Sequence, residues 1–193
     1  MGIEIRLDAD GFNKAITEFP AKLFGEMGRA FRQVGGEFIV KLTRERLSGA
    51  GIKSLARRTG ALVGSFGRVV FGENIDSLTL SIYSDSKYAP IHEFGGTIVP
   101  RNTKYLAIPL GPAKTAAGVS RYKSPRDVPG LKFGGLSRAG NPLLRTVDGV
   151  PMYVLVKSVT IPPRLSMFTT WEQEANNIAV VLNTAIGEII KRF

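Results

Sequence analysis

The feature that most limits the fold of this chain is a pair of helical patterns, one near each end, with short extended runs between them. In the first pattern, apolar residues recur every three or four positions, as one buried helix face requires, at Phe24, Met27, Phe31, Val34, Phe38 and Leu42. The second pattern has the same spacing, at Trp171, Ala175, Ile178, Leu182, Ala185 and Ile189. We therefore expect two long amphipathic helices, with Trp171 in the core.

Residues that start or stop helices set the predicted bounds of the first helix. Pro20 suits a first helical turn, and the Ser-Gly-Ala-Gly stretch after Leu47 ends the pattern. A shorter helix is predicted before it, from an N-cap at Asp10 to Phe19. The sequence thus predicts a break in the helix near Pro20.

The runs between the helices have the composition of strands. GRVVFG and SLTLSIYS are joined by the turn ENID, and TIVP, YLAIPL and MYVLVKSVTIP follow further along the chain. The order of helix, strands and helix predicts an α+β fold in which an antiparallel sheet packs against the two long helices. We expect a single domain, residues 1–193, with a loop insertion at about 111–142.

Positive charge is concentrated in one block of the chain. The net charge is +10, and residues 101–140 alone contain 8 Lys/Arg against one acid, Asp127. This block is rich in Gly, Pro and Ser and has no helical periodicity beyond Leu110, so it is predicted to be a long basic loop. A loop that becomes ordered against a partner is one interpretation, and a solvated insertion without a role is the alternative.

The residue inventory disfavours an enzyme. Without cysteine there is no thiolate ligand or nucleophile, and the single histidine, His92, has no second histidine four residues on for a zinc site. GAGIKS at 49–54 departs from a phosphate-binding loop, because its lysine does not follow a glycine. The acids are scattered, whereas a metal-dependent hydrolase or nuclease needs them clustered. We expect no cofactor and no metal.

The stretch YAPIHEFGG, at 88–96, is predicted to be a structural turn. Gly95 and Gly96 permit a positive φ that reverses the chain into TIVP. In this interpretation His92 donates a hydrogen bond to a backbone carbonyl and Glu93 pairs with an arginine. Because aromatic and charged anchors concentrate in subunit contacts, we assign Tyr88, His92, Glu93 and Phe94 to a subunit interface.

Three motifs, in order, resemble a known family. RRTGALVGSFG at 57–67 is followed by a hairpin, then by YAPIHEFGG at 88–96, and then by IPPRLSMFTTWEQ at 161–173 before the last helix. This arrangement resembles the tail-completion, or tail-to-head joining, proteins of long-tailed phages, also described as minor tail or virion-morphogenesis proteins. The block after Leu110 is longer than the shorter members of the family require, so its role does not follow from the resemblance.

The resemblance implies a structural subunit of the virion neck or tail, assembled in the host bacterial cytoplasm. It implies a homo-oligomeric ring, which we expect to be a hexamer, between the tail terminator or tail tube and the head connector, around the DNA channel. The sequence agrees with a protein that does not reach a membrane, because it has neither a secretory signal pattern nor an apolar run near 18 residues.

In that setting we assign a set of basic residues to docking or to the DNA channel, with a non-specific contact to genomic double-stranded DNA left open. The set is Arg57, Arg58, Arg101, Lys104, Lys114, Arg121, Lys123, Arg126, Lys132 and Arg138. A free nucleic-acid-binding protein acting through a basic patch is the alternative, although few aromatic residues are interleaved with the bases.

Overall fold

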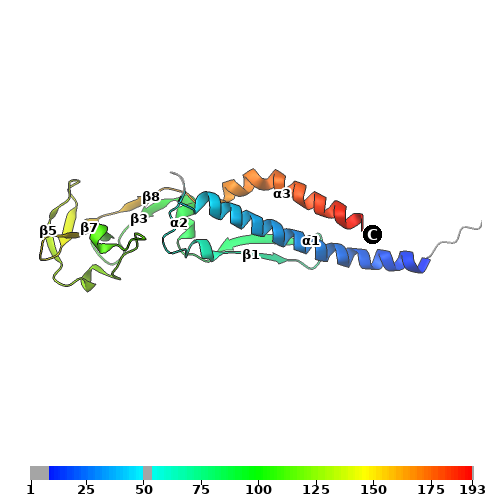
Figure 1. The fold of residues 1–193 in the computed structure, drawn as a ribbon, viewed down its shortest axis with the longest axis horizontal. Helices are drawn as coiled ribbons and strands as arrows, with labels where there is room; N and C mark the ends of the chain where they lie inside the picture. The colour runs from blue at the N-terminus through cyan, green and yellow to red at the C-terminus, as the bar shows by residue number, and fades with distance from the viewer. Residues whose placement is uncertain (1–8, 50–53, 193) are drawn as a thin grey trace, which may run out of the picture. The chain divides into compact units, whose positions relative to one another are not determined.

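The structure is a computed structural model that describes residues 9–49 and 54–192, with the side chains of the first helix described from Glu18 onward. It has the predicted α+β architecture (Figure 1). The helices are α1 (Ala9–Arg46), α2 (Ala89–Phe94) and α3 (Met167–Ile190), with 3-10 turns η1 (Val63–Ser65), η2 (Gly111–Ala113) and η3 (Pro125–Asp127). The strands are β1 (Phe66–Phe71), β2 (Thr79–Ser84), β3 (Gly96–Ile98), β4 (Leu106–Pro109), β5 (Lys132–Leu136), β6 (Pro142–Arg145), β7 (Pro151–Val156) and β8 (Val159–Ile161).

The described residues pack as two compact units, each made from separated parts of the chain. The first unit comprises residues from 1–45, 65–85 and 167–193, and the second comprises residues from 46–64 and 86–166. This division does not follow the predicted insertion at 111–142, which lies within the second unit. The expectation of a single domain stays a prediction.

In the first unit, α3 and the antiparallel β1–β2 hairpin lie along α1 (Figure 1). Phe38 of α1 meets Trp171 of α3 edge-to-face, with the ring centroids 5.1 Å apart. Lys41 of α1 pairs with Glu174 of α3. The predicted face of α1 is confirmed, because its members are buried or half-buried, and the core position of Trp171 agrees with its contact to Phe38.

The predicted break at Pro20 is wrong, because α1 continues through it from Ala9 to Arg46. A proline inside a helix removes one N–H donor and leaves the carbonyl four residues earlier without its usual partner. Pro20 is exposed, and an ion pair between Glu18 and Lys22 spans the site. The N-cap expected at Asp10 is likewise absent, since this residue lies inside the helix.

The second unit holds two further antiparallel sheets. β3 pairs with β8, and a four-stranded sheet has the order β4-β7-β6-β5. The sequence predicted the extended runs of β3, β4, β7 and β8. It did not predict α2, β5 or β6.

The core of the four-stranded sheet includes part of the basic block. Ala113 and Val128 are buried together with Met152 and Tyr153 of β7. Ala113 and Val128 both belong to the basic block, so part of this block lies in a hydrophobic core. The block is therefore not solvated along its whole length.

None of the helices in the described ranges is both long and apolar enough to cross a bilayer.

Candidate interaction surfaces

The residues predicted to form a subunit contact lie on and beside α2. Pro90 stands in the first turn of this helix, where its fixed φ is already helical. Gly95 ends the helix with φ 71°, and Gly96 follows with φ 151°. These values confirm the predicted reversal of the chain at the glycine pair.

α2 is held against the segment that leads into α3. The backbone carbonyl of His92 accepts hydrogen bonds from the backbone N–H groups of Arg164 and Leu165, each 2.8 Å long. Immediately after the helix, Gly96 pairs with Ile161 at the start of the β3–β8 ladder. Two motifs that are far apart in the sequence, 88–96 and 161–173, therefore meet through backbone hydrogen bonds.

The aromatic residues at the two ends of α2 face solvent. The exposed fraction of Tyr88 is 57% and that of Phe94 is 71%, whereas His92 and Glu93 are half-buried. Lys87 places its Nζ 5.3 Å from the centre of the Tyr88 ring, within cation-π range. Two exposed aromatic side chains on a helix fixed by its backbone form a surface suited to a protein contact.

The imidazole of His92 differs from the expectation. Its Nδ1 is buried and has no hydrogen-bond partner among the described residues, so the local hydrogen bond expected of this ring is not made through that atom. Burial lowers the pKa of His92 below its ordinary value, and the nearby charge of Arg164 lowers it further. The ring is thus held toward its neutral form.

The two units differ strongly in net charge. Residues 46–64 and 86–166 contain 16 Lys/Arg and 3 Asp/Glu, a net charge of +13, whereas the rest of the chain contains 10 Lys/Arg and 13 Asp/Glu, a net charge of −3. The ion pairs of the first unit include Lys22–Glu18, Arg29–Glu26, Lys41–Glu45, Lys41–Glu174 and Lys191–Glu188. The second unit is thus a strongly basic body.

Three of the predicted basic residues come together at a small hairpin, 114–120. Lys114 and Ser120 form its bridge. Arg58 donates from Nη1 to the Gly118 carbonyl at 3.1 Å, and Arg121 donates from Nε to the Lys114 carbonyl at 2.6 Å. We call Arg58, Lys114 and Arg121 the hairpin cluster.

The other predicted basic residues lie at separate places. Arg57 packs on Gly60 within its own loop, and the Lys104 ammonium lies 5.6 Å from the centre of the Tyr105 ring. Lys132 of β5 stands opposite Arg145 of β6. The remaining members, which are exposed, are Arg101, Lys123, Arg126 and Arg138.

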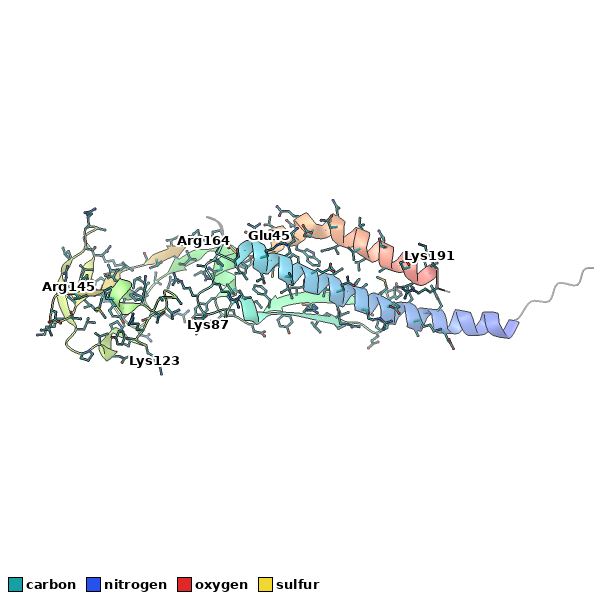
Figure 2. The ribbon with its side chains drawn as sticks, in the orientation of Figure 1. Glu45, Lys87, Lys123, Arg145, Arg164 and Lys191 are labelled. Atoms are coloured by element: carbon teal, nitrogen blue, oxygen red, sulfur yellow. The ribbon has the colours of Figure 1, made fainter. Side chains whose placement is uncertain are left out.

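Sequence reasoning missed part of the basic unit because it looked for a contiguous block. Lys87, Arg145, Lys157 and Arg164 belong to the same unit but lie outside 101–140. Figure 2 labels Lys87, Lys123, Arg145 and Arg164 of this unit, with Arg145 on the four-stranded sheet. The available signal was the near absence of acids from Arg46 to Gly64 and from Ser86 to Ser166.

The first unit contains a hollow of about 210 Å³ where α1, β2 and α3 meet. Its lining is apolar or aromatic throughout: Phe38, Leu80, Ile82, Met167, Phe168 and Trp171. We assign no ligand to it, because a small-molecule site pairs apolar walls with a few convergent polar groups.

In the described ranges, no three His, Asp or Glu side chains gather in a way that would hold a metal ion. The region 49–54, with the rejected phosphate-loop pattern, lies largely outside these ranges. Comparisons with protein-family models, curated proteins and solved structures find no match to this chain.

Proposed function

We propose that this chain is a non-enzymatic structural subunit of a long-tailed phage, forming a ring at the head-tail joint or at the proximal end of the tail. In this proposal the ring joins the tail terminator or tail tube to the head connector and surrounds the DNA channel. The proposal follows from the order of the three motifs at 57–67, 88–96 and 161–173.

The observation that supports the proposal most is the contact between two of those motifs. The His92 carbonyl, in the second motif, receives hydrogen bonds from Arg164 and Leu165 in the third. Motifs that together characterise a family are expected to contact one another in the fold. Here the third motif holds α2, the helix of the second motif, in place. That helix presents Tyr88 and Phe94 to solvent, as a subunit contact requires.

A ring of identical subunits repeats one head-to-tail contact, which needs two different complementary patches on each subunit. We assign one patch to the α2 surface, made of Tyr88, His92, Glu93 and Phe94. The basic residues of the second unit are left for a partner with negative charge.

The test is genetic and morphological. Deleting the gene from the phage that encodes it is expected to leave filled heads and finished tails unjoined, or tails without their proximal ring, in electron micrographs. A plasmid copy of the gene should restore joined particles. Intact infectious particles from the deletion strain would contradict the proposal.

A further inference from the structure

The hairpin cluster has unused hydrogen-bond donors at fixed positions. A guanidinium carries five N–H donors in a rigid fork, and Arg58 and Arg121 each give one N–H to a backbone carbonyl. In the described part of the chain the structure defines no carboxylate contact for either arginine or for Lys114. The remaining donors are held in place and face no internal acid.

The hairpin itself is firmly built. Thr115 and Val119 are joined by a backbone hydrogen bond of 2.8 Å, and Gly118 takes the tight turn at φ 75°. One end of the hairpin is anchored in the core, because Ala113 is fully buried and its carbonyl accepts a hydrogen bond from Arg121 N–H. The cluster is therefore pre-organised, so little order remains to be imposed when a ligand binds.

The chemistry of this cluster favours phosphate groups. Arginine forks match the paired oxygens of a phosphate, and a lysine beside them adds a point charge. The exposed turn residues next to the cluster, Thr115, Ala116 and Ala117, are small and leave room for a close approach. They provide no large apolar anchor of the kind that dominates protein interfaces, which argues against an acidic protein.

The surroundings of the hairpin cluster favour double-stranded nucleic acid over single strands. Tyr122, the aromatic residue next to the cluster in sequence, is half-buried and packs on the core that contains Ala113 and Tyr153. The exposed aromatic residues of the unit, Tyr88, Phe94 and Phe133, lie at the ends of α2 and on β5 and not on the hairpin, so the hairpin itself offers no platform for base stacking. Among the described elements of the unit, the longest helix, α2, has six residues, too few for a recognition helix laid along the major groove. The mode of binding that remains is contact with the phosphate backbone of the nucleic acid, without contact to the bases.

We propose that the second unit binds the phosphate backbone of double-stranded DNA without reading its sequence, and that Arg58, Lys114 and Arg121 form the principal contact. The net charge of +13 on this unit supplies the long-range attraction. The inference deepens the proposed function, because a ring around a genome channel would bring this site to DNA, and it rests on that function only for the source of the DNA.

The test is fluorescence anisotropy of the full chain with a short labelled duplex between about 50 and 200 mM salt. For the wild type we expect binding that weakens steeply with salt and is equal for two unrelated sequences. The triple variant R58Q/K114Q/R121Q is expected to lose about tenfold or more in affinity at low salt. The slope of log affinity against log salt concentration should become shallower by about two to three, near one for each lost phosphate contact.

The matched control removes the same charge elsewhere in the unit. K132Q/R138Q/K157Q changes three exposed bases and should reduce the affinity clearly less than the triple variant. Equal losses in the two triple variants would overturn the assignment to the hairpin cluster. Displacement of the duplex by polyglutamate as readily as by unlabelled duplex would overturn the choice of phosphate.

A single substitution tests the cluster without removing a hydrogen bond of the hairpin. The hairpin uses the backbone carbonyl of Lys114, not a side-chain contact, so K114E keeps that hydrogen bond. K114E should weaken duplex binding more than K132E, with unchanged circular dichroism. Equal effects would contradict the proposal. The mass of each variant in solution without DNA reports ring assembly separately, so a failure of DNA binding is distinguishable from a failure of the proposed function.

Discussion

Gly95 and Pro163 lie so close that a Cβ atom on Gly95 would stand 2.8 Å from Cδ of Pro163 and 3.0 Å from the carbonyl oxygen of Ile161. Gly95 also has φ 71° and ψ −173°, a conformation that is essentially restricted to glycine. The residue that ends α2 is therefore fixed both by its own backbone and by the strand that leads to α3.

Replacing Gly95 by alanine should destabilise the protein strongly. We expect the free energy of unfolding to fall by about 2 to 4 kcal/mol, from the strained backbone and the clash together. Urea denaturation would measure the loss. Gly111→Ala is the control, because a Cβ atom there meets nothing within 4 Å. Equal stability of the two variants would show that α2 is not held in this way.

The exposed aromatic residue of α2 gives a separate test of the subunit contact. Phe94→Ser removes a side chain that is 71% exposed, so the monomer should fold as before, within about 0.5 kcal/mol. If α2 is a subunit contact, the same change lowers the ring fraction in mass photometry. Val147→Ser, at a position 75% exposed, is the matched control and should leave assembly unchanged.

Glu93→Lys tests the charged member of the same surface. Reversing a charge in an interface places it against groups arranged for the opposite sign, so assembly should weaken more than folding does. Thermal melts and mass photometry of the same sample compare the two effects. Equal loss of folding and of assembly would make α2 a core element and not a contact surface.

His92 predicts a defined pH dependence. Its folded-state pKa lies below the ordinary value of 6.5 because of burial and of Arg164. Between the two pKa values the unfolded chain binds the proton more readily, so stability is full above pH 6.5 and falls as the pH drops through the folded-state pKa. His92→Gln should flatten this part of the stability profile.

The titration of His92 is directly observable, because it is the only histidine in the chain. A single imidazole resonance in the NMR spectrum should titrate below pH 6.5. Arg164→Gln should move that midpoint upward, since it removes a repelling charge, but only in part, because burial is the larger cause. A midpoint at or above 6.5 in the wild type would refute the burial of this ring.

The sequence was informative where structure depends on local periodicity. Val34, Phe38 and Leu42 lie on one helical stripe and are all buried, and β1 and β2 form at the two runs predicted from their strand-like composition. β5 and β6 escaped prediction because Gly134, Gly135 and Pro142 have poor strand propensity, and these strands form by pairing next to β7. The contact of Arg58 with Gly118 depends on tertiary folding, which no local pattern reveals.

Gly35 and Gly36, inside α1, were a signal in the sequence that our predictions did not use. A glycine in a helix interior costs about 1 kcal/mol relative to alanine. At Gly35, unlike Gly25 of the same helix, this cost coincides with a close approach by another element. At Gly35 a Cβ atom would lie 2.9 Å from Cδ of Arg68 and 3.0 Å from Cδ1 of Leu80. Glycine at this position leaves room for these two side chains of the hairpin against α1.

Gly35→Leu should therefore lower the free energy of unfolding by about 1 to 3 kcal/mol, because the larger side chain pushes β1 and β2 away from α1. Gly25→Ala in the same helix meets nothing within 4 Å and should raise stability by up to about 1 kcal/mol. Chemical denaturation of both variants provides the comparison. A stabilising effect of Gly35→Leu would contradict the packing of the hairpin on α1.

Burial of Val128 argues against both interpretations of the basic block, as a solvated insertion and as a loop that becomes ordered only against a partner. Val128 is 6% exposed and packs with Ala113, Met152 and Tyr153, so the block should be protected from trypsin around Arg121, Lys123 and Arg126 in the isolated chain. Val128→Asp places an unpaired charge in this core and should speed cleavage at those three sites. Val147→Asp puts the same group on a side chain that is 75% exposed and should leave the cleavage rate unchanged. Wild-type cleavage as fast as that of Val128→Asp would restore the solvated insertion, since it would mean that this core does not hold the block.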